Sequence, residues 1–283
     1  MTADYQGVQN SQFLTRQSSR SSNSPPKVGS SRVKSPLPAP AAYRASCSMS
    51  AAAKRYKYLR RIFHFRHMDF EFALWQMLYL FYKPQQVYRN FQYRKETKAQ
   101  FARDDPAFLV LLSAWLIITS AGFSLVLGIH FYGFLKFLLY VIFVDMVGVG
   151  LVIATALWYI SNTFLLKPGV RDVDVEWGFS FDVHLNAFFP ILVILHFVQL
   201  FVYHPLIERD WFMSTMFGNT LWLVALSYYI YITFLGYSSL NILNRTNYFL
   251  APLTILVFFY ILTLGLNWNL SRSLMDFYKY RVL

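Results

Sequence analysis

The segment AFLVLLSAWLIITSAGFSLVLGI, residues 107–129, decides the fold, because its 23 residues contain no charged side chain. A bilayer has a hydrocarbon core of about 30 Å, which an α-helix crosses with about 20 consecutive apolar residues. Uninterrupted apolar length of this kind is the sequence signal of a membrane-spanning helix. We therefore predict that this segment crosses a membrane.

Four further segments of the same kind follow along the chain. They contain one charged residue between them, Asp145, and comprise residues 137–160, 185–207, 213–236 and 248–268. Over the whole chain 56% of residues are hydrophobic and 14% are charged, whereas about 25% are charged in an ordinary soluble domain. The sequence therefore predicts an all-α integral membrane protein with five transmembrane helices across residues 107–268.

A shorter apolar segment, FEFALWQMLYLFY at residues 70–82, precedes the bundle. As a helix it would reach about 20 Å, which is less than the hydrocarbon core. We expect a short amphipathic helix over residues 69–83 in the cytosolic interface; the alternative is a short sixth helix packed inside the bundle. Flanking cations and aromatic rings suit contact with acidic lipid headgroups. The candidate residues for binding lipid or a cytosolic partner are Arg60, Arg61, Arg66, Trp75, Lys83, Arg89, Arg94 and Lys95.

The distribution of cations predicts the orientation of the bundle. Of 26 Lys and Arg residues, 18 precede residue 104, and such an excess marks the cytosolic side of a membrane protein. The N-terminus is therefore expected in the cytosol, and five crossings place the short tail at residues 269–283 in the lumen. Residues 54–106 form a basic cytosolic region, whereas residues 1–53 are rich in Ser and Pro and are expected to be disordered.

Motifs for nucleotide binding or catalysis are absent from the sequence. It contains no P-loop, no GxGxxG after a strand, no HExxH and no GxSxG. The lone cysteine, Cys47, excludes an intrachain disulfide and a cysteine-based zinc site. We therefore predict a non-enzymatic protein with no catalytic residue, no metal site and no cofactor.

Asp145 is unusual because an unpaired carboxylate in the middle of a membrane helix costs at least about 2.5 kcal/mol. His196 and Gln199 lie three residues apart on the third predicted span, on one helical face, and His204 lies two turns further along. Asp145, His196 and Gln199 form a candidate intramembrane polar cluster, and His204 is a further available partner. Hydrogen bonding between helices is the default interpretation. The alternative is a proton or small-solute pathway through Asp145 and His196.

Two other patterns predict local geometry. The spacing of the small residues Gly150 and Ala154 favours close approach by another helix. Between Val173 and Val183, apolar and polar residues alternate strictly. Because side chains of an extended chain alternate between two sides, this second pattern predicts an extended segment with one apolar face.

Three long blocks of sequence carry a resemblance to a known family. They are RRIFHFRHMDFEFALWQMLYLFYKPQQVYRNFQYRKETKAQFARDDPAFLVLL (60–112), VDMVGVGLVIAT (144–155) and VEWGFSFDVHLNAFFPILV (175–193). Together they resemble the uncoordinated-fifty (Unc-fifty) family of Golgi multipass membrane proteins, from about residue 54 onward. The resemblance implies five membrane helices, a cytosolic N-terminus, a luminal C-terminus and a non-enzymatic role in early secretory and Golgi trafficking.

The resemblance also implies particular partners. Members of the family are linked to recruitment of large Arf guanine-nucleotide exchange factors and to surface delivery of nicotinic acetylcholine receptors, whose subunits would be cargo. An RNA-binding form in the inner nuclear membrane is also implied.

Three classes of function follow. The first is a trafficking adaptor in the Golgi membrane, and the second is a transporter that uses Asp145 and His196. The third is an RNA-binding membrane protein that uses KRYKYLRRIFHFR (54–66), in which six cations alternate with aromatic residues that can stack on bases. The same composition beside a membrane is typical of contact with acidic lipids. The adaptor is the predicted function, because of the resemblance.

Overall fold

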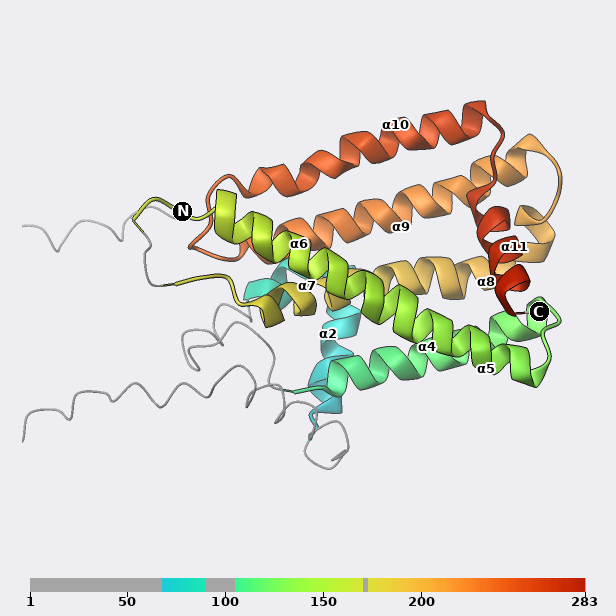
Figure 1. Ribbon diagram of the computed structural model, residues 1–283, viewed down its shortest axis with the longest axis horizontal. Helices are drawn as coiled ribbons and strands as arrows, with labels where there is room; N and C mark the ends of the chain where they lie inside the picture. The colour runs from blue at the N-terminus through green and yellow to red at the C-terminus, as the bar shows by residue number, and fades with distance from the viewer. Residues whose placement is uncertain (1–67, 90–104, 170–172, 283) are drawn as a thin grey trace, which may run out of the picture. The chain divides into compact units, whose positions relative to one another are not determined.

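The computed structural model describes residues 68–89, 105–169 and 173–282, so the tail predicted at residues 1–53 lies outside the described part. Within that part, five helical spans are long and apolar enough to cross a membrane, which confirms the predicted number. They run back and forth beside one another (Figure 1). The spans are Ala107–Val126, Phe131–Phe164, Trp177–Ile207, Phe212–Ser238 and Thr246–Gly265.

Several spans change helix type along their length. The first is α4 (Ala107–Val126), and the second joins α5 (Phe131–Tyr140), η2 (Val141–Gly148) and α6 (Val149–Phe164). The third joins α7 (Trp177–Ile191), η3 (Leu192–Val198), α8 (Gln199–Val202) and η4 (Tyr203–Ile207). The fourth is α9 (Phe212–Ser238), and the fifth joins η5 (Thr246–Leu250) to α10 (Ala251–Gly265).

The wide π-helical turns of the third span lie close to proline. Pro190 is the second-last residue of α7, which leads into η3, and Pro205 lies within η4. A proline has no backbone N–H, so the carbonyl four residues before it loses its helical partner and the local turn readjusts. The third span is therefore irregular near Pro190 because of its own sequence.

Two spans begin more than one helical turn earlier than predicted. The second begins at Phe131 and includes Lys136, whose Nζ lies 5.0 Å from the centre of the Tyr132 ring. A lysine near a helix end can extend its charge along the surface toward water, so it does not end a span. The third begins at Trp177, so the prediction of an extended segment is wrong from Trp177 onward. Polar and apolar residues are both buried there, because α7 packs against α6 on one side and α9 on another.

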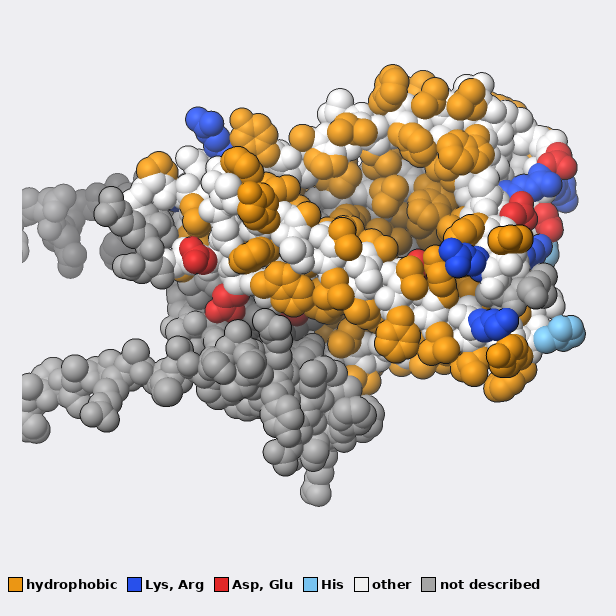
Figure 2. All heavy atoms as spheres, in the orientation of Figure 1, with side chains coloured by type: hydrophobic (Ala, Val, Ile, Leu, Met, Phe, Trp, Pro, Cys, Tyr) orange, Lys and Arg blue, Asp and Glu red, His pale blue; other side chains and the backbone are white. Residues whose placement is uncertain are grey.

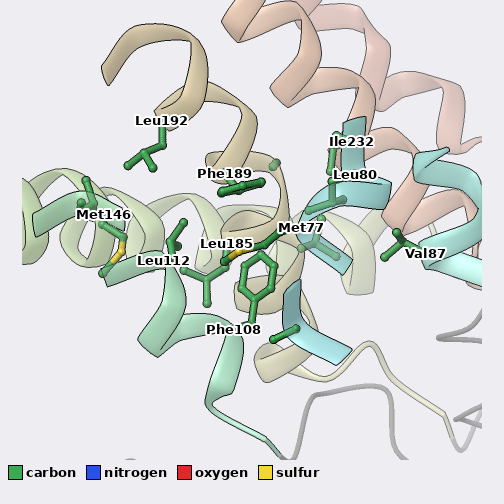
Figure 3. Close-up of a cluster of buried hydrophobic side chains, with 14 of the residues drawn as sticks. Met77, Leu80, Val87, Phe108, Leu112, Met146, Leu185, Phe189, Leu192 and Ile232 are labelled. Atoms are coloured by element: carbon green, nitrogen blue, oxygen red, sulfur yellow. The ribbon is translucent and has the colours of Figure 1, made fainter. Parts of the chain in front are cut away.

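The core of the bundle combines α2 (Phe70–Tyr82) with side chains from the first and third spans. In Figure 3, Met77 of α2 lies near Leu185 of α7 and Phe108 of α4, and Leu80 of α2 lies near Ile232 of α9. The rings of Phe108 and Phe189 meet edge to face with centroids 6.4 Å apart. Because lipid tails are as apolar as these side chains, close van der Waals packing stabilises the core, rather than exclusion of water.

Gly150 confirms the close helix approach predicted from its spacing with Ala154. A Cβ atom at Gly150 would lie 2.5 Å from Nε2 of His184 on α7, and Ala154 is fully buried. The absence of a side chain at Gly150 therefore lets α6 and α7 meet around the His184 ring.

The C-terminal part of the bundle differs from the rest. Helix α10 packs mainly on α9, and only 11% of its most apolar stretch is buried. Residues 269–283 were predicted only as a short tail, but they include α11 (Leu270–Val282), which lies across one end of the bundle against α5 and α9 (Figure 1). Hydrophobic side chains cover much of the visible face of the spans, and charged groups gather near α11 (Figure 2).

Candidate functional site

Three of the eight residues predicted to bind lipid or a cytosolic partner belong to the described part. Trp75 is half-buried and stacks on Tyr79 with ring centroids 4.1 Å apart. Lys83 follows the last residue of α2, and Arg89 is the last described residue of a second helical stretch that begins at residue 84; both side chains are exposed. The other five lie outside the described residues: Arg60, Arg61, Arg66, Arg94 and Lys95.

Helix α2 has the bounds expected from residues 70–82, and local signals explain both ends. Oδ1 of Asp69 accepts a hydrogen bond from the backbone N–H of Phe72 at 2.9 Å, as a helix N-cap does. The helix ends before Lys83, whose following residue, Pro84, disfavours helical backbone in the residue that precedes it. Asp105 accepts hydrogen bonds from the backbone N–H groups of Asp69 and Ala107, at 2.8 and 3.0 Å, and so ties the start of α2 to the start of α4.

Hydrogen bonds from two spans hold α2 on the bundle. The Gln76 side chain donates to Oδ1 of Asn186 on α7 at 3.2 Å, and both side chains are buried. The Tyr228 hydroxyl on α9 donates to the carbonyl of Leu80 at 2.8 Å. Tyr228 lies ten residues before the end of α9 at Ser238, which is about 15 Å along a helix. Helix α2 therefore packs against the flank of the bundle rather than only on its end.

The opposite side of α2 is apolar and exposed. Leu74, Leu78 and Tyr82 follow one another at spacings of four residues and are 50%, 60% and 83% exposed. Together with Lys83 and Arg89, these residues are called the α2 platform below. The polar Gln76 points into the bundle. The prediction of a helix packed in the bundle therefore describes the inner side of α2, and the prediction of an interfacial helix describes its exposed outer side. The level of α2 in a bilayer stays a prediction.

Asp145 is hydrogen-bonded between helices, as expected, but its partner is one that the sequence did not indicate. The hydroxyl of Tyr278 on α11 donates to Oδ2 of Asp145 at 2.5 Å. Within the described residues, no hydrogen bond joins Asp145 to His196 or Gln199. His196 packs edge-on against Phe123, with ring centroids 5.6 Å apart. The predicted cluster is therefore not a hydrogen-bonded unit.

The other polar residues of the third span have separate surroundings. Gln199 is 1% exposed, and neither its Nε2 nor its Oε1 has a hydrogen-bond partner within the described residues. His204 lies at the end of the span, where Nδ1 meets Glu208 at 2.5 Å and Nε2 meets the carbonyl of Val126 at 3.1 Å. His204 therefore connects η4 to the end of α4.

Tyr278 is suited to donate a proton in its hydrogen bond to Asp145. It is 5% exposed, and burial, reinforced by the adjacent Asp145, raises the pKa of the phenol above its ordinary value. The hydroxyl therefore remains protonated at neutral pH. This bond attaches α11 to the middle of the second span.

His184 is a central residue that the sequence analysis missed. Nδ1 lies 2.8 Å from the Tyr229 hydroxyl on α9, and Nε2 lies 3.2 Å from the backbone carbonyl of Met146 in η2. Because a carbonyl can only accept, Nε2 carries the proton and Nδ1 accepts from Tyr229. One imidazole thus joins the second, third and fourth spans. The sequence did offer a signal, because a spacing of four residues would place Ser180 and His184 on one face of a helix. The expectation of an extended chain in this segment left that signal unused.

Several polar groups inside the bundle join helices to one another. Within residues 68–89, 105–169 and 173–282, no group of three or more His, Cys, Asp or Glu side chains is arranged to hold a metal ion. The polar side chains with assigned partners at Gln76, Asp145 and His184 each bridge different helices. Of the residues predicted to meet a partner, Lys83 and Arg89 are exposed, and both belong to the α2 platform.

Comparison with known proteins identifies the family. The model described as "UNC-50 family" matches residues 58–279. Protein unc-50 homolog A of Xenopus laevis is 59% identical over 239 residues, which cover 84% of this chain and 92% of that protein. The Homo sapiens homolog is 61% identical over 233 residues, covering 82% and 90%, and the Drosophila melanogaster homolog is 54% identical over 252 residues, covering 89% and 91%. No solved structure matches. The matched region contains α2 and all five spans, and the chain therefore belongs to the UNC-50 family.

Proposed function

We propose that this protein is a non-enzymatic adaptor of Golgi and early secretory membranes, and that its α2 platform holds a peripheral protein on the cytosolic surface. By its resemblance to the Unc-fifty family, that partner is a large Arf guanine-nucleotide exchange factor. The same resemblance makes subunits of nicotinic acetylcholine receptors the cargo whose surface delivery depends on it.

The observation that carries this proposal is the way α2 is held. Its inner side is bonded to α7 through Gln76 and to α9 through Tyr228, whereas Leu74 and Leu78 remain exposed on the outer side. A docking surface requires a preformed backbone with apolar side chains that a partner can cover. Helix α2 combines both properties.

The charges beside α2 give this surface a preferred environment. Lys83 and Arg89 are exposed next to the apolar row, and each cation near an acidic cytosolic leaflet contributes roughly 1 kcal/mol of attraction. The platform therefore suits the boundary between acidic headgroups and the cytosol, where a peripheral protein meets the membrane. This location agrees with the cytosolic N-terminus expected from the distribution of Lys and Arg.

The transporter alternative receives less support. Asp145 is bonded to Tyr278, and its proposed relay partner His196 packs against Phe123 instead. A relay requires proton-carrying groups within hydrogen-bond reach of one another. The stretch at residues 54–66, on which the RNA-binding alternative depends, lies outside the described residues.

The test is recruitment of the exchange factor in cells that lack the native protein. The double variant Lys83→Glu/Arg89→Glu should reduce the exchange factor on Golgi membranes by more than about tenfold, because each reversal removes roughly 1 kcal/mol of attraction to the surface. A matched control, Lys136→Glu/Arg281→Glu, changes the net charge equally at exposed residues that do not belong to the platform. Imaging at matched abundance measures the difference.

A second pair of variants tests the apolar row. Leu74→Ser/Leu78→Ser should lower recruitment, whereas Ile255→Ser/Ile261→Ser, which changes two exposed residues of α10, should not. Equal recruitment by both pairs would remove the α2 platform from the mechanism. Reversal of Arg60, Arg61 and Arg66 tests the preceding basic stretch by the same assay.

A further inference from the structure

Two adjoining cavities lie at the end of the bundle that carries α11. The first, of about 390 Å³, is an open groove between α9, α10 and α11 and is almost entirely apolar, with Leu223 and Leu226 on α9, Leu256 and Phe259 on α10, and Leu274 on α11. In Figure 2 the visible face is hollowed below α10, and hydrophobic side chains line the hollow. This cavity is suited to a hydrocarbon chain.

The second cavity, of about 310 Å³, is polar and lies nearer the end of the bundle. Arg209, Asp210, Arg272 and Asp276 are among the residues that line it. Trp268 and Ser273 belong to the walls of both cavities, and the indole N–H of Trp268 donates to the Ser273 hydroxyl at 2.8 Å. The two cavities therefore share a wall, with polar groups on one side of it and apolar groups on the other.

The dimensions correspond to part of one lipid leaflet. The apolar cavity follows α9 from Asn219 to Leu226, which is about 10 Å of helix. One leaflet of the hydrocarbon core is about 15 Å thick. A chain in this cavity would therefore pass through about two thirds of the leaflet, while the polar cavity would lie at headgroup level. Trp268, between them, is a residue type that favours the membrane interface.

The charges in the polar cavity are balanced and incompletely paired. Arg272 forms a salt bridge with Asp210. Within the described part of the chain, neither Arg209 nor Asp276 takes part in a salt bridge. A free guanidinium suits a phosphate, and a free carboxylate suits an amine. A ligand that carries both charges would complement this cavity, whereas a purely anionic ligand would meet Asp210 and Asp276.

We propose that these cavities form a binding site for one glycerophospholipid with a zwitterionic, amine-bearing headgroup. One acyl chain occupies the apolar cavity between α9, α10 and α11. The phosphate contacts Arg209 and Arg272, and the headgroup amine contacts Asp276. The site lies at the end of the bundle that carries α11, away from α2 (Figure 1), and does not depend on the adaptor function proposed above.

The first experiment uses the full chain purified in detergent micelles and measures bound lipid directly by native mass spectrometry. Dioleoyl phosphatidylethanolamine added at increasing concentration should remain bound at one molecule per chain. It should also raise the thermal unfolding temperature of the protein. Inorganic phosphate, dioleoylglycerol and dioleoyl phosphatidylglycerol, each at the same concentrations, test the phosphate, the acyl chains and the charge of the headgroup separately.

Matched variants locate the site. Leu256→Trp fills the apolar cavity and should abolish retention of the lipid, whereas Ile255→Trp, at the 71% exposed neighbouring residue, should not. Arg209→Ala and Asp276→Ala should each weaken binding about tenfold, since each removes one charged contact. Lys136→Ala, at an exposed cation that does not line either cavity, is the charge control.

Several results would overturn the proposal. Wild-type protein that retains no phosphatidylethanolamine would refute it without reference to any variant. If inorganic phosphate stabilised the protein as much as phosphatidylethanolamine does, the site would be a simple anion site. If dioleoylglycerol did so, the polar cavity would have no part in binding. Equal binding of phosphatidylglycerol would exclude the role of Asp276. Loss of lipid from both Trp variants would show that the lipid does not occupy this cavity.

Discussion

Tyr278→Phe removes the hydroxyl that donates to Asp145 across 2.5 Å and leaves the rest of the ring in place. The ring packs edge-on against Phe137 with centroids 5.1 Å apart, and a phenylalanine can keep that contact. The substitution therefore isolates one hydrogen bond, the bond that attaches α11 to the second span.

The size of the effect follows from burial at both ends of this bond. Tyr278 is 5% exposed, and Asp145 is half-buried within η2. A buried acceptor that loses its donor costs about 1–3 kcal/mol, so we expect Tyr278→Phe to lower the free energy of unfolding by that amount. Tyr280→Phe is the matched control, because Tyr280 is 86% exposed and two residues away on the same helix. A surface change of this kind stays within about 0.5 kcal/mol.

A conservative substitution of Asp145, the acceptor in this bond, should lower the free energy of unfolding less than Tyr278→Phe does. Asp145→Asn keeps a side-chain oxygen that can accept from Tyr278, so we expect a loss below about 1 kcal/mol. Asp145→Leu leaves the Tyr278 hydroxyl without its acceptor and should cost about as much as Tyr278→Phe. The double variant Asp145→Leu/Tyr278→Phe should be more stable than the sum of the single losses predicts, because the two residues share one bond.

The assay is reversible unfolding of the purified protein in mixed micelles, with increasing denaturing detergent. It also has a pH signature. Because burial raises the pKa of Tyr278 in the folded protein, the folded state keeps this proton above pH of about 10, where the tyrosine of the unfolded chain loses it. The stability that Tyr278 contributes is therefore complete below pH of about 10 and decreases above it. Above that pH, the difference in the free energy of unfolding between wild type and Tyr278→Phe should become smaller. Equal stability of Tyr278→Phe and Tyr280→Phe at neutral pH would refute the role of this bond.

Two further predictions follow from the packing of the spans. Gly150→Ala should lower the free energy of unfolding by about 1–3 kcal/mol, since its Cβ would lie 2.5 Å from the bonded ring of His184; Gly265→Ala, which has nothing within 4 Å, should be neutral in the same assay. Asn269 should remain unglycosylated in cells, because its amide donates to the carbonyl of Ile207 at 3.0 Å. An acceptor site added on a polar spacer beyond Leu283 should be glycosylated if the C-terminus is luminal. Glycosylation of an acceptor site added at the N-terminus, with none at the C-terminal site, would show that the orientation is the inverse of the predicted one.

The sequence by itself determined the features that depend on neighbouring residues. Five long apolar runs, with Asp145 as their one charged residue, were enough to predict five spans, because each must satisfy its backbone hydrogen bonds internally within lipid. Helix α2 was also predicted, over residues 69–83, and it is found at Phe70–Tyr82. Gly150 predicted a close approach because the absence of a side chain is a property of the residue itself.

Only the tertiary structure decided which residues meet. Asp145 needs a partner on physical grounds, but Tyr278 lies 133 residues away and reaches it only because α11 folds back across the bundle. The alternation before Val183 suggested an extended chain, whereas α7 is buried on several sides and therefore has no polar face to reveal its helical period. The inward direction of Gln76 was hidden in the same way, because in lipid the apolar side of a helix can face outward and its polar side chain inward, toward Asn186.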